Sequence, residues 1–287
     1  MEWLLFALLC SFFNALQQVS TRRTLRHVDQ YVVVLSYFLF SMPFLWFSLW
    51  FVGVPSLKPG FWSACLWSIA INLVAFTLYI KALQLSSLAL TVPFLAFTPL
   101  FLLPVAYVLR GERAGPQGWL GIMLIVLGAY VLNIKHRRRG WLAPFRAILK
   151  ERGSVLMLIV AGLWSFSATI EKTAVLASSP VFYPAVFSLV FPFLYGPIAL
   201  WGSRTPVRTL KRRLHELVAL GFLEGVMSIF QMMALQMSLV VYVIAVKRSG
   251  MVFAVLIGAV FLGEKEWREH LVGSLMMAAG VVLISLS

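Results

Sequence analysis

The sequence predicts an all-α polytopic membrane protein whose ten transmembrane helices form two inverted five-helix repeats. Of the 287 residues, 61% are hydrophobic and only 12% are charged, whereas a soluble domain carries about 25% charged residues. Long apolar runs alternate with short polar loops, and the two halves of the chain resemble each other. This composition excludes a soluble enzyme, a disordered chain and a disulfide-rich scaffold.

Each apolar run is long enough to cross a bilayer, which requires about 20 mostly apolar residues. Because lipid offers no hydrogen-bond partners to free backbone groups, each run is expected to be a helix. The ten predicted spans are residues 3–21, 30–53, 61–81, 87–109, 117–134, 154–176, 180–202, 216–237, 239–262 and 269–286.

Lysine and arginine residues concentrate in the loops after the odd-numbered spans. Residues 135–153 and 203–215 carry half of them, whereas only Lys58, Arg110 and Arg113 follow even-numbered spans. An excess of basic residues marks the cytoplasmic side. These loops are therefore predicted to be cytoplasmic, with both termini periplasmic in a bacterial inner (plasma) membrane. Because the loops lie beside the membrane, we expect them to bind anionic lipid headgroups and no nucleic acid.

The two halves align without a gap from Ala82 to Ile134, at an offset of 152 residues. Within this stretch Ala82-Leu83-Gln84 matches Ala234-Leu235-Gln236, and near the starts of the halves the offset becomes 154. Each half holds five spans, an odd number, so the second copy must enter the membrane from the opposite side. Such inverted repeats are typical of transporters with a substrate site near the bilayer midplane.

The repeat defines the predicted domains. A first five-helix repeat covers residues 1–134, a basic cytoplasmic linker covers 135–153, and a second five-helix repeat covers 154–287.

Glycines recur at a seven-residue spacing in the fifth and tenth spans, as Gly121 and Gly128 and as their repeat-mates Gly273 and Gly280. Because this spacing puts small residues on one helix face, where backbones can approach closely, both spans are predicted to be packing elements.

Two other repeated features concern spans 4, 7 and 9. The Gly111-Glu112 and Gly263-Glu264 pairs are predicted to be turns that end spans 4 and 9, with the glutamates anchoring the loops. Three prolines in each of spans 4 and 7 predict bends in these helices.

Lys247 and Arg248 are the most informative charges inside the spans. They lie eight or nine residues into span 9, roughly 12–14 Å along the helix axis and therefore near the midplane. A charge at this depth costs about 2.5–3.5 kcal/mol. The pair either binds an anionic group of a ligand or forms a structural ion pair with Glu224 or Glu171.

Further polar residues inside the spans are candidates for binding the substrate. Glu224 is either a partner of Lys247 or a carboxylate that couples transport to a proton, because a low-dielectric surrounding favours the neutral carboxyl form. The alternative for the other polar positions is hydrogen bonding between helices, and Lys172 is expected to extend to the membrane interface. The remaining candidates are Glu171, Asn14, Asn72, Gln231 and Tyr79.

The repeat resembles the drug/metabolite transporter superfamily, in its EamA-like family, over nearly the whole chain. The residues that carry the resemblance run from Lys81-Ala82-Leu83-Gln84 to Gly111-Glu112, and from Ala234-Leu235-Gln236 to Gly263-Glu264. The resemblance implies a central cavity lined by spans 1–4 and 6–9, and the export of small metabolites. The triose-phosphate translocator branch is similar at Lys247 and Arg248, where its own Lys-Arg pair holds phosphate. That branch also has a lysine in span 4, which this chain lacks.

The predicted function is secondary transport of a small organic metabolite, with an anionic solute as one option, by alternating access and in the direction of export. The alternative is a flippase or transporter of an amphipathic or lipid-linked substrate, since the spans are rich in aromatic residues. We expect no enzymatic activity, no catalytic residue, no cofactor and no metal site. A small-molecule solute, membrane lipids and a coupling proton are the expected partners of a monomer.

Overall fold

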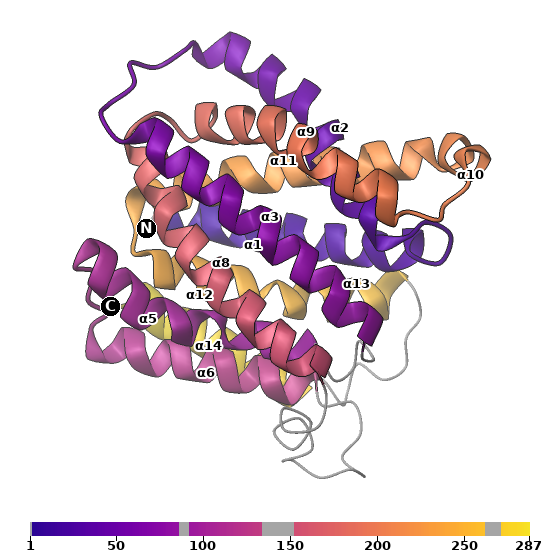
Figure 1. Ribbon diagram of the computed structural model, residues 1–287. Helices are drawn as coiled ribbons and strands as arrows, with labels where there is room; N and C mark the ends of the chain where they lie inside the picture. The colour runs from indigo at the N-terminus through magenta and orange to yellow at the C-terminus, as the bar shows by residue number, and fades with distance from the viewer. Residues whose placement is uncertain (1, 86–91, 134–151, 262–270) are drawn as a thin grey trace. The chain divides into compact units, whose positions relative to one another are not determined.

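The computed structural model describes residues 2–85, 92–133, 152–261 and 271–287, and every regular element in these residues is a helix (Figure 1). The helices are α1 (Glu2–Thr24), α2 (Gln30–Val52), α3 (Phe61–Leu85), the 3-10 helix η1 (Val92–Phe97), α5 (Thr98–Arg110), α6 (Pro116–Asn133), α8 (Arg152–Leu176), α9 (Phe182–Gly202), α10 (Val207–Arg212), α11 (Leu214–Met237), α12 (Val240–Arg248), α13 (Gly250–Phe261) and α14 (Leu271–Ser285).

Seven helical stretches of the described residues are long and apolar enough to cross a membrane. They are α1, α2, α3, α8, α9, α11 and the stretch Val240–Ile257, which runs from α12 into α13. Three shorter apolar helices, Phe94–Arg110, Pro116–Val131 and Leu271–Ser285, fall where the fourth, fifth and tenth spans are predicted. Within the described residues, the structure therefore confirms an all-helical, multi-pass membrane protein.

Some helix ends differ from the predicted spans because helices continue beyond the apolar runs. Arg22 and Arg23, expected in a loop, lie in the last turn of α1, where cations interact favourably with the helix dipole. The predicted loop 203–215 contains the short basic helix α10. Residues 135–151 of the predicted linker lie outside the described residues, and α8 begins at Arg152.

The helices form two compact units, and both sequence repeats contribute to each unit. Unit 1 contains Val74–Thr169 and Ser238–Ser287, and unit 2 contains Glu2–Leu73 and Ile170–Met237. Two helices, α3 and α8, contribute residues to both units.

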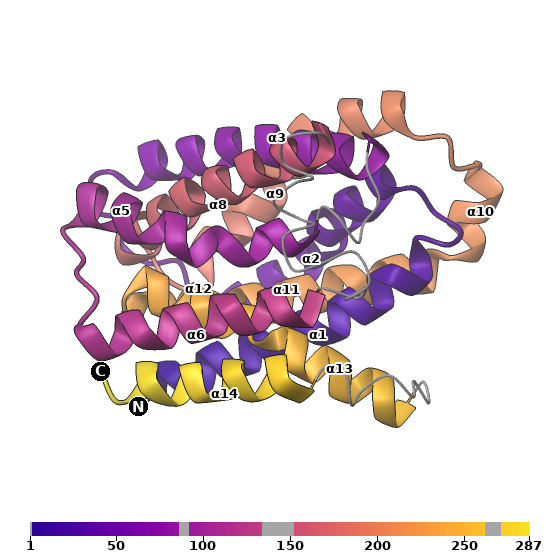
Figure 2. The same ribbon diagram turned by 90° about the horizontal axis from the view of Figure 1, so that it is seen from below.

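In unit 1, α6 and α14 lie side by side along their length (Figure 2). A Cβ atom added at Gly121 would be 2.6 Å from the carbonyl oxygen of Gly280, and one added at Gly128 would be 2.6 Å from that of Gly273. The helices are therefore antiparallel and in backbone contact, as the glycine spacing predicts. The repeat also converts each of these contacts into the other, since Gly121 corresponds to Gly273 and Gly128 to Gly280.

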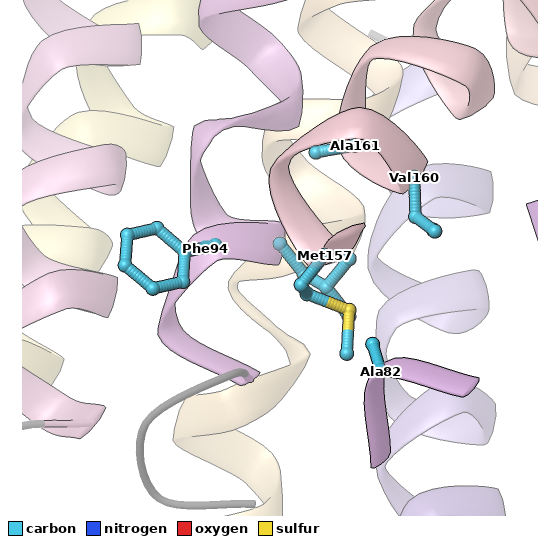
Figure 3. Close-up of a cluster of buried hydrophobic side chains, with 6 residues drawn as sticks. Ala82, Phe94, Met157, Val160 and Ala161 are labelled. Atoms are coloured by element: carbon cyan, nitrogen blue, oxygen red, sulfur yellow. The ribbon is translucent and has the colours of Figure 1, made fainter. Parts of the chain in front are cut away.

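A second part of the core of unit 1 joins α3, η1 and α8. Met157, Val160 and Ala161 of α8 pack against Ala82 of α3 and Phe94 of η1 (Figure 3). Each of these side chains is at most 1% exposed. Because lipid is as apolar as these side chains, this contact is stabilised by van der Waals packing between the helices.

In unit 2, α11 packs against α1 and α2, and α2 packs against α9. Gly221 lets α11 approach the backbone of α2 at Ser36 and Phe40. Between α2 and α9, the ring of Phe38 lies 4.5 Å from that of Phe191.

Asp29 holds two loops of unit 2 together. Its carboxylate accepts a hydrogen bond from the N–H of Val32 and so caps the start of α2. The same carboxylate accepts hydrogen bonds from the hydroxyls of Ser203 and Thr205, each at 2.6 Å, and from the N–H groups of Arg204 and Thr205. Burial raises the pKa of Asp29, but these hydrogen bonds outweigh it and leave the pKa below its ordinary value.

Candidate functional site

The fourth and ninth spans of the sequence are both interrupted in unit 1. In the fourth, the 3-10 helix η1 ends at Phe97 and α5 begins at Thr98, with a proline in its first turn. In the ninth, α12 ends at Arg248 and α13 begins at Gly250. Because Thr98 and Gly250 are repeat-mates at the offset of 152, the two interruptions occupy corresponding positions. Such paired interruptions are the best sequence pointer to a binding site in transporters.

Lys247 and Arg248 lie at the last turn of α12, directly before the interruption. This position is favourable for cations, because the C-terminal end of a helix carries a partial negative charge. The two side chains are half-buried. The sequence correctly predicts that the pair lies within an apolar segment, but it does not predict that the helix ends there.

Arg248 has a hydrogen-bonding capacity that the described residues do not satisfy. Its Nη2 donates to the hydroxyl of Thr98, at 3.0 Å, across the two interrupted spans. Its Nε is buried and has no hydrogen-bond partner within the described part of the chain. Leaving a buried charged donor unpaired is costly, so this N–H is a candidate to bind a ligand oxygen. Thr98, which the sequence does not single out, therefore joins the candidate site residues.

Tyr79, the third candidate in unit 1, lies on α3. Its ring centroid is 5.7 Å from that of Trp164 on α8, and Phe76 contacts the same tryptophan at 5.6 Å. Tyr79 is therefore part of an aromatic cluster between α3 and α8.

Unit 2 holds the other predicted site residues. Glu224, in the middle of α11, accepts a hydrogen bond of 2.6 Å from the side-chain amide of Gln17 on α1. Asn14, one turn before Gln18 on α1, is 8% exposed and therefore buried.

Glu171, on α8, accepts hydrogen bonds from neutral polar groups of two other helices. The amide of Asn72 and the hydroxyl of Ser68, both on α3, donate to one carboxylate oxygen at 3.3 and 3.4 Å. The amide of Gln231, on α11, donates to the other oxygen at 3.5 Å. Ser68 also bonds the hydroxyl of Tyr183 at 2.8 Å. The sequence signal for Ser68 is its position one turn before Asn72.

The expectation for Lys172 is wrong. Its side chain is 7% exposed and buried in unit 2 instead of extending to the interface. Adjacent residues on a helix point about 100° apart, so Lys172 is buried while Glu171 stays half-buried.

The loop anchor predicted at Glu112 is confirmed. Gly111 has a left-handed backbone, with φ of 68°, and ends α5. Glu112 accepts a hydrogen bond of 2.9 Å from the N–H of Val240, the first residue of α12, and one from Arg110. The corresponding Gly263-Glu264 pair lies outside the described residues.

These long apolar helices with polar residues inside them define an integral multi-pass membrane protein. The sequence model of the EamA-like transporter family matches residues 1–134 and again residues 151–286. The chain therefore belongs to the EamA-like transporter family, as the resemblance of its repeats predicts.

The chain also matches solved structures. One of these, described only as the crystal structure of a protein, is 16% identical in sequence with a TM-score of 0.83. The match covers 99% of this chain and 96% of that one, so the two share a fold. No curated protein matches the chain.

Proposed function

We propose that the protein is a secondary transporter that exports a small organic metabolite with an anionic group across the bacterial inner membrane by alternating access. The observation that carries the proposal is the buried Nε of Arg248, which has no partner among the described residues. A guanidinium binds a carboxylate or phosphate at two points, and members of this family are membrane transporters.

The proposed binding residues fall into two sets, one within each unit. In unit 1, Arg248 and Lys247 bind the anionic group and Tyr79 provides an aromatic surface. In unit 2, the polar side chains are those of Glu224, Glu171, Asn14, Asn72 and Gln231. A coupling proton and membrane lipids complete the partners of a monomeric transporter.

The ten spans are proposed to form inverted repeats at 1–134 and 154–287, joined by a cytoplasmic linker, with periplasmic termini. Two observations support this arrangement. The repeat offset converts each of the two glycine contacts between the antiparallel helices α6 and α14 into the other. The interruptions at Thr98 and Gly250 also fall at corresponding positions of the two repeats.

The alternative, an amphipathic or lipid-linked substrate, rests on the aromatic residues of the second and third spans. Trp46, Trp50 and Trp67 are 40%, 85% and 66% exposed. Such outward-facing tryptophans are typical of side chains that contact lipid or the membrane interface, so these residues do not favour the alternative.

The test compares the growth medium of bacteria with and without the protein by untargeted mass spectrometry. An anionic metabolite should accumulate in the medium only when the protein is present. Arg248→Lys keeps the charge but loses the planar fork, so it should lower this accumulation by about tenfold or more, since a charged hydrogen bond contributes about 1.5–3 kcal/mol. The matched control is Arg208→Lys, on the exposed face of α10, which should transport normally.

Two outcomes would overturn the proposal. One is that no anionic metabolite accumulates in the medium only when the protein is present. The other is normal release by Arg248→Lys at equal amounts of protein in the membrane, which would make Arg248 a purely structural residue.

A further inference from the structure

Two carboxylate–amide pairs in unit 2 correspond to each other under the repeat. In one pair, Gln17 of α1 donates to Glu224 of α11, and in the other, Asn72 of α3 donates to Glu171 of α8. Gln17 and Glu171 are repeat-mates at the offset of 154, and Asn72 and Glu224 are repeat-mates at 152. The repeat therefore relates the two pairs to each other, but each helix that carries the amide in one pair corresponds to the helix that carries the carboxylate in the other.

This exchange indicates what is common to both copies. Each pair keeps one carboxylate and one amide, whichever helix carries them. Two helices that needed only a hydrogen bond could use two amides, whereas a charged side chain inside a membrane span costs about 2.5–3.5 kcal/mol near the bilayer centre. Because this cost is present twice, at corresponding positions, the two carboxyl groups are expected to have a role that an amide cannot fill.

An amide is a suitable partner for a carboxyl group that gains and loses a proton. Its NH2 group donates to the ionised carboxylate, and its oxygen accepts from the protonated carboxyl. A lysine, which can only donate, stabilises the ionised form alone. Gln17 and Asn72 are each 6% exposed, so their amides can keep the half-buried carboxyl groups of Glu224 and Glu171 hydrogen-bonded in both states.

The neighbouring groups within unit 2 differ between the pairs. Glu171 faces Ser68 of α3, Tyr183 of α9 and Gln231 of α11, and Lys172 follows it on its own helix. The hydroxyls of Ser68 and Tyr183 bond each other, and either can be the donor.

Glu224 faces the amide of Gln17 from α1. Beside it, Gly225 contacts the ring of Phe44 from α2. The titratable side chains of α2 include Tyr31 and Tyr37. Tyr37 bonds Thr21, one turn beyond Gln17 on α1.

We propose that Gln17–Glu224 and Asn72–Glu171 are two repeat-related proton-binding sites, so that the transporter carries two exchangeable protons inside unit 2. Each carboxylate takes up one proton to become a neutral carboxyl group and returns that proton unchanged, with no other bond made or broken. This inference rests on the proposed transport function, because it identifies the partner that drives it.

The test follows the carboxyl groups directly and needs no solute. Purified full-length protein in lipid vesicles is titrated from alkaline to acidic pH, and infrared difference spectra record the C=O stretch of protonated carboxyl groups. Glu224→Gln and Glu171→Gln should each remove one component of this signal, and the double variant should remove both. The pairs should also tolerate exchange: Gln17→Glu combined with Glu224→Gln should restore the lost component.

The matched control for the exchange is Gln18→Glu combined with Glu224→Gln. Position 18 points about 100° away from position 17 on α1, so its carboxyl group should not restore the Glu224 component. The spectra are compared in sodium chloride and in choline chloride, and they should be the same in both.

Three results would overturn the inference. The components could be unaffected by either glutamine substitution, the exchanged pair could fail to restore a component while the protein stays folded, or sodium could abolish the signal, which would indicate sodium sites. None of these results bears on the release of an anionic metabolite, which tests the proposed function separately.

Discussion

The close contact between α6 and α14 makes a quantitative prediction for Gly128→Ala. The new Cβ atom would be 2.6 Å from the backbone oxygen of Gly273 and 2.7 Å from Cγ of Met277. Ordinary van der Waals contact begins at 3.4 Å, so the helices would have to separate by about 0.8 Å. A backbone oxygen cannot rotate away as a side chain can, and the strain falls on the whole contact.

The cost of this separation follows from packing. A gap of 0.5–1 Å forfeits roughly a quarter to a half of the dispersion attraction between the atoms concerned. The contact includes Ile125 of α6 and Met277 of α14, both completely buried. We therefore expect Gly128→Ala to lower the free energy of unfolding by about 1–3 kcal/mol, the usual cost of overpacking.

The assay is unfolding by sodium dodecyl sulfate in mixed micelles, followed by far-ultraviolet circular dichroism. Gly162→Ala in α8 and Gly196→Ala in α9 are matched controls, because a Cβ atom at either position has no neighbour within 4 Å among the residues that the structure describes. Alanine favours helix over glycine by about 1 kcal/mol, so the controls should be neutral or stabilising. The reasoning is refuted if Gly128→Ala is as stable as the controls.

Three other predictions concern two loops and the C-terminus. Asp29→Asn should lower the free energy of unfolding by about 1–3 kcal/mol at neutral pH. Because the pKa of Asp29 is lower in the folded than in the unfolded protein, acid-unfolding curves should show the whole stability difference above about pH 4, and the difference should vanish as the pH falls further. Glu112→Ala, which removes the acceptor of the Val240 N–H, should cost about 0.5–2 kcal/mol in thermal denaturation, and an unchanged Tm would refute the cap. An alkaline phosphatase fused after Ser287 should be active in a bacterial host, and an inactive fusion with a working cytoplasmic reporter would reverse the predicted topology.

The sequence predicts where the helices are, because apolar composition alone decides which segments enter lipid. It also predicts the backbone contact of α6 and α14, since the glycine spacing leaves one helix face without side chains. It does not predict the end of α12 at Arg248, where no proline marks the interruption and only Gly250 follows. The helix α10 was missed because six mostly polar residues leave no apolar period to detect.

The candidate site was predictable as a set of residues but not as a set of contacts. A charge inside an apolar run is visible in the sequence, and both Glu224 and Glu171 are found this way. Their partners depend on how each helix is rotated about its own axis, and one residue changes that direction by about 100°. The roles of Gln17, Ser68 and Thr98 therefore emerge only from the structure, as does the burial of Lys172.

The division of each repeat between two compact units has a consequence for synthesis on the ribosome. Unit 2 is complete once Met237 has been made, whereas unit 1 also needs the last fifty residues. Gly121 leaves the ribosome 159 residues before its neighbour Gly280, a delay of roughly 8–30 s at about 5–20 residues per second. During that interval the glycine face of α6 has no α14 to cover it, so a nascent chain that stalls before α14 should be the form most exposed to quality-control proteases.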